Sequence, residues 1–370
     1  MAKKRRKKTL ENNESISKNN DKKNEMFNKF KSELETKYWK WVILKADGDS
    51  IKIPTYSTKI LTLDKILWGG IPKWRIVEIY WEESSGKTTF CLHLIWQIQK
   101  QWGLAWFVDF EQAINLDWAK HLWVNLDNLA LVQPDYWEQW WEVLIEMTAS
   151  WLFDVIVVDS VAAMIPKAEL EGDVEDHWMG LQARMMWKIL RKLSPIASKT
   201  WTTVIFINQT RQKIWVLYWN PETTPWGNAL KFFASQRIKI SKKDKINDKK
   251  KWEIWYNMKF LTVKNKITSP KKETLVKFTY ENWFDYLEDL INYLTNIWII
   301  KKAWAFLSIE IDGKEYKAQW IEKFKQLILD NNLEEKLFEI WYNAKSERNM
   351  ETNEELNEYD NSEEILKDVE

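Results

Sequence analysis

Between about residues 50 and 286, short apolar runs alternate with segments in which apolar residues recur at helical spacing. Most of these runs are rich in β-branched and aromatic residues, which is typical of strands buried on both faces of a sheet. The pattern predicts strands at Ile76–Tyr80, Leu104–Asp109, Val155–Asp159, Thr203–Asn208, Arg237–Ile240 and Asn257–Val263. Strands that alternate with helices indicate an α/β domain with a mostly parallel central sheet.

The segments on either side of this region have different patterns. Apolar residues at helical spacing predict one amphipathic helix from about Glu25 to Trp39, and the pattern from Glu281 to about Lys345 turns helical, with candidate helices at Asp285–Leu294 and Ile321–Asn331. We therefore expect five regions: a disordered basic arm (1–24), a helical N-terminal oligomerisation segment (25–48), the α/β core (49–285), a small α+β C-terminal domain (286–345) and a disordered acidic tail (346–370).

Charge and cysteine content limit the class of protein. The formal net charge is only +1, but six consecutive basic residues begin at Lys3 and the last 24 residues are rich in Asp and Glu. Such blocks are usually solvated tails, and they also suit a protein that binds polyanions. One cysteine, Cys91, excludes an intramolecular disulfide and favours a reducing cytoplasm. The sequence contains no apolar stretch of 18 residues, no secretory signal and no metal-type spacing of its three histidines.

The strand at Ile76–Tyr80 is followed by W-E-E-S-S-G-K-T, residues 81–88, and then by a helical pattern. This is the phosphate-binding loop pattern G-x-x-x-x-G-K-[ST] with tryptophan at its first glycine. Lys87 is expected to neutralise phosphate charge, and Thr88 to bind Mg²⁺. The predicted nucleotide-binding residues are Trp81, Glu82, Glu83, Ser84, Ser85, Gly86, Lys87, Thr88, Thr89 and Asp159.

Two carboxylates at predicted strand ends complete this chemistry. Asp159 ends the apolar run Val155–Asp159, where a carboxylate can hold Mg²⁺ through a water molecule. Glu111 follows the strand at Leu104–Asp109 and could polarise an attacking water as a general base. On the residues alone, an ordinary surface glutamate is the usual interpretation of Glu111. A strand-end aspartate is often only a helix cap, but the phosphate loop favours the Mg²⁺ role for Asp159.

Tryptophan is abundant where glycine is expected. The chain has 27 Trp and 9 Gly, and Trp68, Trp102, Trp219 and Trp226 stand in turn-like contexts. A left-handed backbone costs a non-glycine residue roughly 1–2 kcal/mol, so a dozen such sites would consume the roughly 5–15 kcal/mol that stabilises a domain. We hypothesise that the gene uses a code in which UGA specifies glycine; the alternative is a truly tryptophan-rich protein. An indole at position 81 is expected to fill the phosphate site.

The chain resembles the bacterial RecA recombinases over about Phe30 to Asn331. The matching strings are Val155–Ala163, Pro166–Gly172, Met179–Met186, Phe206–Gln209, Asn220–Thr224, Gly227–Phe232 and Val263–Lys266. Family glycines fall at Trp39, Trp41, Trp68, Trp74, Trp81, Trp123, Trp137, Trp151, Trp201, Trp215, Trp219, Trp226 and Trp304. The resemblance therefore implies the fold of a RecA-like P-loop NTPase core, and it agrees with the recoding hypothesis.

The resemblance also implies roles for individual residues. Glu111 is implied to activate water and Gln209 to sense the γ-phosphate, while Lys264 and Lys266 would reach the nucleotide of a neighbouring protomer in a helical filament. Two DNA-binding loops are implied at about Glu171–Arg184 and Thr210–Asn228. The implied DNA-binding residues are Met179, Arg184, Arg191, Arg211, Lys213, Glu222, Thr223, Trp226, Gly227 and Asn228.

The function implied by the resemblance is an ATP-dependent recombinase of the cytoplasm that requires ATP and Mg²⁺. Its partners would be single- and double-stranded DNA, other copies of itself and a LexA-type repressor whose self-cleavage it stimulates. Glu82, Asn115, Trp118 and the pair His177–Trp178 depart from the family pattern. Two alternatives stay open: a hexameric helicase built on the same core, and a DNA-coating protein that binds ATP without hydrolysing it.

Overall fold

The computed structural model describes residues 22–37, 53–134, 136–164, 179–212, 222–223, 228–247, 254–279 and 283–344. The chain divides into two units, Met1–Ile53 and Pro54–Glu370. The first unit contains a helix over residues 22–37, on which Met26, Phe27 and Phe30 are exposed. This confirms the expected N-terminal helix, although the helix already includes residues 22–24, which were predicted to belong to the disordered arm. The rest of the arm and the acidic tail lie outside the described residues.

The second unit is built on a nine-stranded sheet with the order β13-β12-β11-β10-β3-β7-β6-β4-β5. The six strands from β10 to β5 are parallel, and β11, β12 and β13 continue the sheet antiparallel. The strands are β3 (Ile76–Trp81), β4 (Ala105–Asp109), β5 (Leu129–Val132), β6 (Val155–Asp159), β7 (Thr203–Gln209), β10 (Gln236–Asn247), β11 (Ile254–Asn265), β12 (Glu273–Thr279) and β13 (Trp283–Phe284). The mostly parallel α/β fold expected from the sequence is confirmed.

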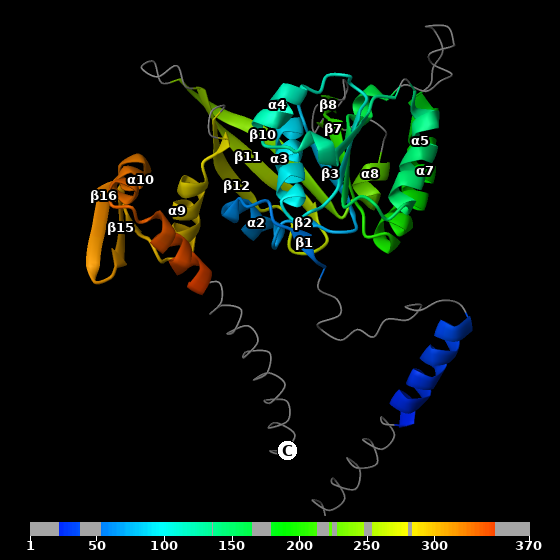
Figure 1. Cartoon of the computed structure of the whole chain (residues 1–370), viewed down its shortest axis with the longest axis horizontal. Helices are drawn as coiled ribbons and strands as arrows, with labels where there is room; N and C mark the ends of the chain where they lie inside the picture. Colours follow the sequence, from blue (N-terminus) through cyan, green and yellow to red (C-terminus); the bar gives the residue numbers. More distant parts are fainter. Residues whose placement is uncertain are drawn as a thin grey trace, which may run out of the picture. The chain divides into compact units, whose positions relative to one another are not determined.

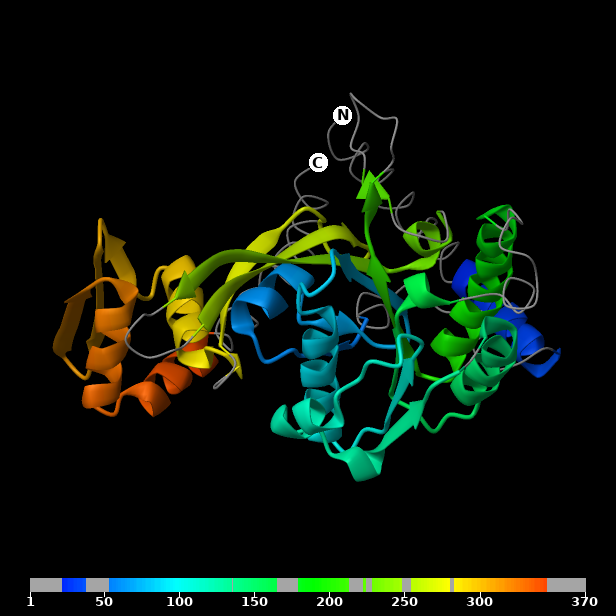
Figure 2. The same ribbon diagram turned by 90° about the horizontal axis from the view of Figure 1, so that it is seen from above.

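Helices cover both faces of the sheet, so the core has three layers (Figures 1 and 2). Alternate residues of each strand face opposite sides: Val155 and Val157 pack in one apolar cluster, and Ile156 and Val158 in the other. The first cluster includes α2 (Leu61–Leu67), α3 (Lys87–Gln99) and α4 (Leu116–His121), and the second includes α5 (Trp137–Ala149), α7 (Met179–Lys199) and α8 (Ala229–Phe233). Cys91 is fully buried in the first cluster, as a small apolar residue would be.

Short elements complete the described core. A two-stranded sheet pairs β1 (Thr55–Tyr56) with β2 (Ile71–Pro72), another pairs β8 (Arg211–Gln212) with β9 (Glu222–Thr223), and two 3-10 helices span Leu126–Asn128 and Val161–Ala163. None of the helices in the described ranges is long and apolar enough to cross a lipid bilayer.

The C-terminal region has its own apolar core, which includes Leu290, Leu307 and Phe324. It consists of α9 (Tyr286–Asn296), an antiparallel sheet of β14 (Lys301–Ala303), β15 (Phe306–Ile311) and β16 (Lys314–Gln319), α10 (Ile321–Asp330) and a helix over residues 334–344. Both predicted helices and the α+β class of this region are confirmed, although the sequence analysis assigned no residues to its three strands. Charged residues dominate β14 and β16, so neither is an apolar run.

Candidate nucleotide site

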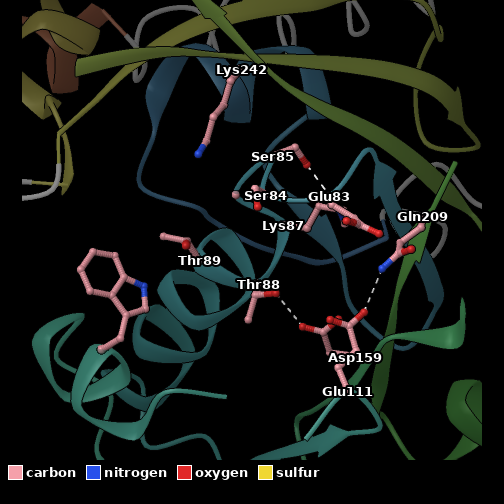
Figure 3. Close-up of a pocket in the computed structure, with 12 residues that line it drawn as sticks. Glu83, Ser84, Ser85, Lys87, Thr88, Thr89, Glu111, Asp159, Gln209 and Lys242 are labelled. Carbon is pink, nitrogen blue, oxygen red and sulfur yellow. Dashed lines mark hydrogen bonds between the residues drawn. The ribbon is translucent and has the colours of Figure 1, made fainter. Parts of the chain in front are cut away.

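Four neighbouring parallel strands, β3, β7, β6 and β4, end at the same edge of the sheet. A cavity of about 600 Å³ opens there (Figure 3), within the size range of small-molecule sites. It is lined by Glu83, Ser84, Ser85, Gly86, Lys87, Thr88, Thr89, Glu111, Trp118, Asp159, Gln209 and Lys242. Residues from six separate segments therefore meet where the sequence predicts a nucleotide.

The loop between β3 and α3 has the backbone that a phosphate-binding loop needs. Gly86 has φ +92°, a left-handed conformation that L side chains rarely adopt, and it occupies the N-cap position of the 13-residue helix α3. A Cβ atom on Gly86 would also lie 2.7 Å from Cε of Met258, which belongs to β11. The start of α3 thus directs its free N–H groups and positive dipole end toward the cavity.

Lys87 is almost completely buried beneath this loop. Its ammonium group donates hydrogen bonds to the carbonyl oxygens of Glu82 at 2.6 Å and Trp81 at 3.3 Å. Burial lowers the pKa of Lys87, while the negative charges of Asp159, Glu111 and Glu83 oppose that shift. The ammonium therefore organises the loop around itself and supplies positive charge to an otherwise acidic pocket.

Thr88 and Asp159 form a pair of hard oxygen ligands across the pocket. The Thr88 hydroxyl donates to Oδ2 of Asp159 at 2.6 Å. Burial raises the pKa of Asp159 to about 7, and the hydrogen bond from Thr88 lowers it in part. The described residues contain no cluster of three or more His, Cys, Asp or Glu side chains that could hold a metal ion. One hydroxyl and one carboxylate suit Mg²⁺, which usually takes one or two protein ligands, substrate phosphates and waters.

Glu111 is held by groups from two other strand ends. Its Oε1 accepts a hydrogen bond from the Ser160 hydroxyl at 2.5 Å and from Nε2 of Gln209 at 3.0 Å. Figure 3 shows Glu111 and Gln209 pointing toward each other on the pocket wall. Three adjacent strands, β4, β6 and β7, thus orient one carboxylate, which favours a specific role over that of a surface glutamate.

Two predicted nucleotide-binding residues, Trp81 and Glu82, do not line the cavity. Trp81 is the last residue of β3, and its backbone is not among the left-handed residues. Nζ of Lys239 lies 3.3 Å from the centre of the Trp81 indole. The expectation that an indole at position 81 fills the phosphate site is therefore wrong, because the extended backbone directs the ring elsewhere.

The pocket also contains residues that motif analysis did not select as site residues. Trp118 on α4 forms one wall, and its ring packs 5.3 Å from that of Trp283. Lys242 of β10 points toward the cavity (Figure 3). Its Nζ also lies 4.5 Å from the centre of the Tyr256 ring. The sequence offers no local signal for Lys242, because it is one of several lysines in a charged strand.

Lys264 and Lys266 lie outside the cavity lining. The Lys264 ammonium donates to the carbonyl oxygens of Lys231 at 2.7 Å and Phe232 at 2.8 Å, near the C-terminal end of α8. Burial is the main cause of the lowered pKa of Lys264, and the charge of Lys266 adds to it. Lys266 is exposed just beyond β11. Their roles toward a neighbouring protomer stay predictions.

The predicted DNA-binding residues are only partly described. Met179, Arg184 and Arg191 lie along α7, and Asn228 is at the N-cap position of α8. Arg211 pairs with Thr223, and Gln212 with Glu222, so β8 and β9 join the two ends of the second predicted loop. Lys213, Trp226, Gly227 and most of both loops lie outside the described residues. The DNA contacts thus also stay predictions.

Comparisons with known proteins agree with the architecture of the site. The model of the RecA N-terminal domain family matches residues 25–285. Protein RecA of Deinococcus radiodurans is 45% identical over 294 residues, which cover 79% of this chain and 80% of that protein. Protein RecA of Streptococcus sanguinis is 44% identical, with 76% and 74% covered, and that of Desulforapulum autotrophicum is 42% identical, with 81% and 86% covered.

Proposed function

The chain belongs to the RecA family, which acts in the recombination and repair of DNA, and on this basis we propose a specific activity. The protein is an ATP-dependent recombinase that forms helical filaments on single-stranded DNA, pairs them with homologous duplex DNA and exchanges strands. Its filaments also stimulate self-cleavage of a LexA-type repressor. ATP hydrolysis requires Mg²⁺ and drives turnover and release.

The observation that carries this proposal is the position of the Glu111 carboxylate, which is held by two hydrogen bonds in the same cavity as Lys87. Glu111 accepts hydrogen bonds from Ser160 and Gln209 and lines the same cavity as the phosphate loop. A carboxylate held in this way can take a proton from water as that water attacks a phosphoryl group. A protein that only coats DNA has no need of such a base, so the geometry favours hydrolysis.

The remaining pocket residues bind and orient the triphosphate. Lys87 and the N-terminal end of α3 neutralise phosphate charge, and the loop residues from Glu83 to Thr88 line the same cavity. Thr88 would ligate Mg²⁺ directly and Asp159 through a water molecule. The bound ion would offset the negative charge that develops during phosphoryl transfer.

Gln209 is suited to couple the nucleotide to DNA. Its side chain contacts Glu111 at 3.0 Å, and only Thr210 separates it from β8. Because β8 and β9 join the two ends of the second predicted DNA-binding loop, a change of Gln209 on γ-phosphate loss would be transmitted directly to that loop. The same link would let bound DNA adjust the base and stimulate hydrolysis.

The test compares phosphate release and strand exchange by the wild type, Lys87→Ala and a matched surface variant, Lys120→Ala, whose lysine is exposed on α4. The wild type and Lys120→Ala should release phosphate faster when single-stranded DNA is added, and both should exchange strands. Lys87→Ala should do neither. Full activity of Lys87→Ala would overturn the proposed mechanism. Phosphate release that ignores single-stranded DNA would overturn the recombinase assignment.

LexA cleavage forms a separate arm of the test. Filaments of the wild type with ATP and single-stranded DNA should accelerate self-cleavage of a purified LexA-type repressor. Lys87→Ala, which is not expected to form the active filament, should leave the cleavage rate at its uncatalysed value. Strand exchange without any acceleration of cleavage would remove the repressor from the proposed partners and leave the recombinase activity standing.

A further inference from the structure

Tryptophan dominates the left-handed backbone positions of this protein. Within the described ranges, sixteen non-glycine residues have positive φ, and ten of the sixteen are tryptophan: Trp68, Trp74, Trp102, Trp123, Trp151, Trp201, Trp283, Trp298, Trp304 and Trp320. Only a few per cent of non-glycine residues normally adopt this conformation, and those are chiefly Asn, Asp and His. A bulky aromatic residue has no intrinsic preference for it, so the enrichment needs a cause.

Three of the ten end helices in a hydrogen-bond pattern that favours glycine. After α3, the N–H of Trp102 donates to Gln99 and that of Gly103 to Ile98, at 2.9 and 3.1 Å. The same pair of bonds closes α4 at Trp123 and α9 at Trp298. This is the Schellman motif, whose left-handed C′ residue is usually glycine and sometimes asparagine. Asn332 closes α10 in the same way, with N–H donation from Asn332 and Leu333 to Leu329 and Ile328.

Further positions have other reasons to require glycine. Trp304 has φ 56° and is the first of two loop residues between β14 and β15, a position that favours glycine in tight hairpins. Trp320, before α10, combines φ 66° with ψ 147°, close to a region that is essentially restricted to glycine. Trp68 caps α2 in the left-handed conformation, immediately before Gly69 and Gly70.

The indoles at these positions gain little from packing. Eight of the ten are more than half exposed, and Trp102, Trp298 and Trp304 are 95%, 86% and 98% exposed. Burial therefore cannot offset the backbone strain at most of these sites. By contrast, Trp106 and Trp140, which lie in a strand and a helix, are buried and have no left-handed backbone. Most of the strained sites are therefore ones where the side chain contributes little to packing; Trp283, which is 4% exposed, is the buried exception.

We propose that these ten positions hold glycine in the protein that its own cells synthesise. A genetic code in which UGA specifies glycine produces this pattern, because a conventional reading of such a gene enters tryptophan at each UGA. Six of the ten positions, 68, 74, 123, 151, 201 and 304, are family glycines by the resemblance; 102, 283, 298 and 320 follow from the backbone alone. Position 81 is not used as evidence for the proposal, because the backbone there is extended.

The assignment changes one wall of the nucleotide pocket. Glycine at position 283 removes the ring that packs 5.3 Å from that of Trp118, and glycine at position 123 removes a ring 5.8 Å from that of Trp283. Trp118 has a helical backbone and lines the cavity, so it is not among the positions assigned to glycine. Its indole then faces the pocket without the Trp283 ring, and the ring of His121 remains 5.6 Å from it.

The direct test is peptide mass spectrometry of the protein purified from its native cells, together with the codons of its gene. Peptides that contain positions 102, 298 and 304 should have the mass of glycine at each site, and all ten codons should be UGA. Tryptophan in these peptides, or UGG at the ten codons, would overturn the proposal. Neither readout depends on ATP hydrolysis, so the result is independent of the proposed function.

A second test measures stability in recombinant protein. The chain with all ten tryptophans changed to glycine should melt at least about 10 °C above the chain with tryptophan, because the backbone strain relieved at ten positions exceeds the packing lost with the one buried ring, that of Trp283. Trp304→Gly alone should raise the melting temperature by a few degrees, whereas the matched control Trp187→Gly should lower it, since Trp187 is an exposed residue within α7. A ten-glycine protein that melts at the same or a lower temperature would contradict the proposal.

Discussion

Two buried aspartates, Asp159 in the nucleotide pocket and Asp289 on α9, share their local chemistry but not their surroundings. Each accepts a hydrogen bond from a threonine hydroxyl, Thr88 and Thr62 respectively. Burial raises the pKa of Asp159 to about 7 and that of Asp289 to about 6. Asp289 also accepts from the backbone N–H groups of Leu61, at 2.5 Å, and Thr62, at 3.3 Å, whereas Asp159 lines an open cavity.

The difference separates a structural carboxylate from a ligand-binding one. Asp289 satisfies N–H groups at the start of α2, so it ties the C-terminal region to the core. Asp159 keeps lone pairs directed at the cavity, where a cation can take them. Removal of Asp289 should therefore affect folding, and removal of Asp159 should affect chemistry. The following variants test this distinction, from the largest expected effect to the smallest.

Glu111→Gln should reduce the rate of phosphate release by about 10²–10⁴-fold, because an amide cannot accept the proton of the attacking water. The amide oxygen can still accept hydrogen bonds from Ser160 and Gln209, so nucleotide affinity and folding stability should change little. Steady-state phosphate release and nucleotide titration measure the two quantities. Glu142→Gln, an exposed change on α5, is the control. Equal loss of affinity and rate would assign Glu111 to binding instead.

Asp289→Asn should change the pH dependence of stability. The pKa of Asp289 is raised from 3.8 to about 6 in the folded state, so the folded protein holds a proton that the unfolded chain has released between these pH values. The wild type should accordingly lose up to about 3 kcal/mol of unfolding free energy from this group as pH rises from 4 to 7. The neutral asparagine contributes no such pH-dependent change in unfolding free energy.

Urea denaturation of both proteins at pH 4, 5, 6 and 7 measures this effect. The unfolding free energy of the wild type minus that of Asp289→Asn should decrease steadily as pH rises, while ATP hydrolysis at a permissive pH stays similar in both. If the unfolding free energies of the two proteins changed with pH in parallel, Asp289 would not titrate in this range. The structural role assigned to Asp289 would then be contradicted.

In contrast to Asp289→Asn, Asp159→Asn should affect catalysis and leave folding stability nearly unchanged. Loss of a carboxylate that holds Mg²⁺ through water should reduce Mg²⁺-dependent phosphate release by about 10–100-fold. Folding stability at pH 8 should be unchanged or slightly higher, because the variant no longer buries a charge there. Phosphate release at increasing Mg²⁺ and urea denaturation give the two readouts. Reduced stability with unchanged release would reverse the roles assigned to the two aspartates.

Lys242→Met should weaken nucleotide binding by only about 2–5-fold, since an exposed cation contributes about 0.2–1 kcal/mol to a charge pair. The loss should shrink as salt concentration rises. Lys243→Met, an exposed neighbour that does not line the cavity, should bind nucleotide as the wild type does. Fluorescent-nucleotide titration at two salt concentrations measures both. Identical affinities of the two variants would exclude Lys242 from the site.

The sequence predicted the central strands because they are buried on both faces and therefore read as apolar runs. Val155–Asp159 was predicted to the residue, and five other strands were found with ends shifted by one or more residues. The missed strands are of a different kind. β5 has the sequence LALV, an apolar run of only four residues, and β12 begins with Glu273 and Thr274 and has polar residues on both sides of its apolar ones. An apolar run as short as β5 does not distinguish a strand from a helical segment, and a strand such as β12 has no continuous apolar signal.

Local motifs also predicted Lys87, Thr88 and Asp159, because each stands in a short, recognisable string of residues. The contact of Glu111 with Gln209 and Ser160 could not be read in this way. It depends on β4, β6 and β7 being adjacent, although 98 residues separate Glu111 from Gln209. The role of Trp81 was misjudged for a related reason: the loop pattern names a residue type, but only the backbone direction determines where its side chain lies.

By itself, the amino-acid sequence determined the alternation of strands and helices, the phosphate loop and the excess of tryptophan, because each is a property of near neighbours along the chain. The tertiary structure alone decided which carboxylate is satisfied and which faces a cavity, and which tryptophans occupy left-handed turns. Those properties depend on solvent exclusion and on backbone conformation, both of which arise only when distant segments pack together.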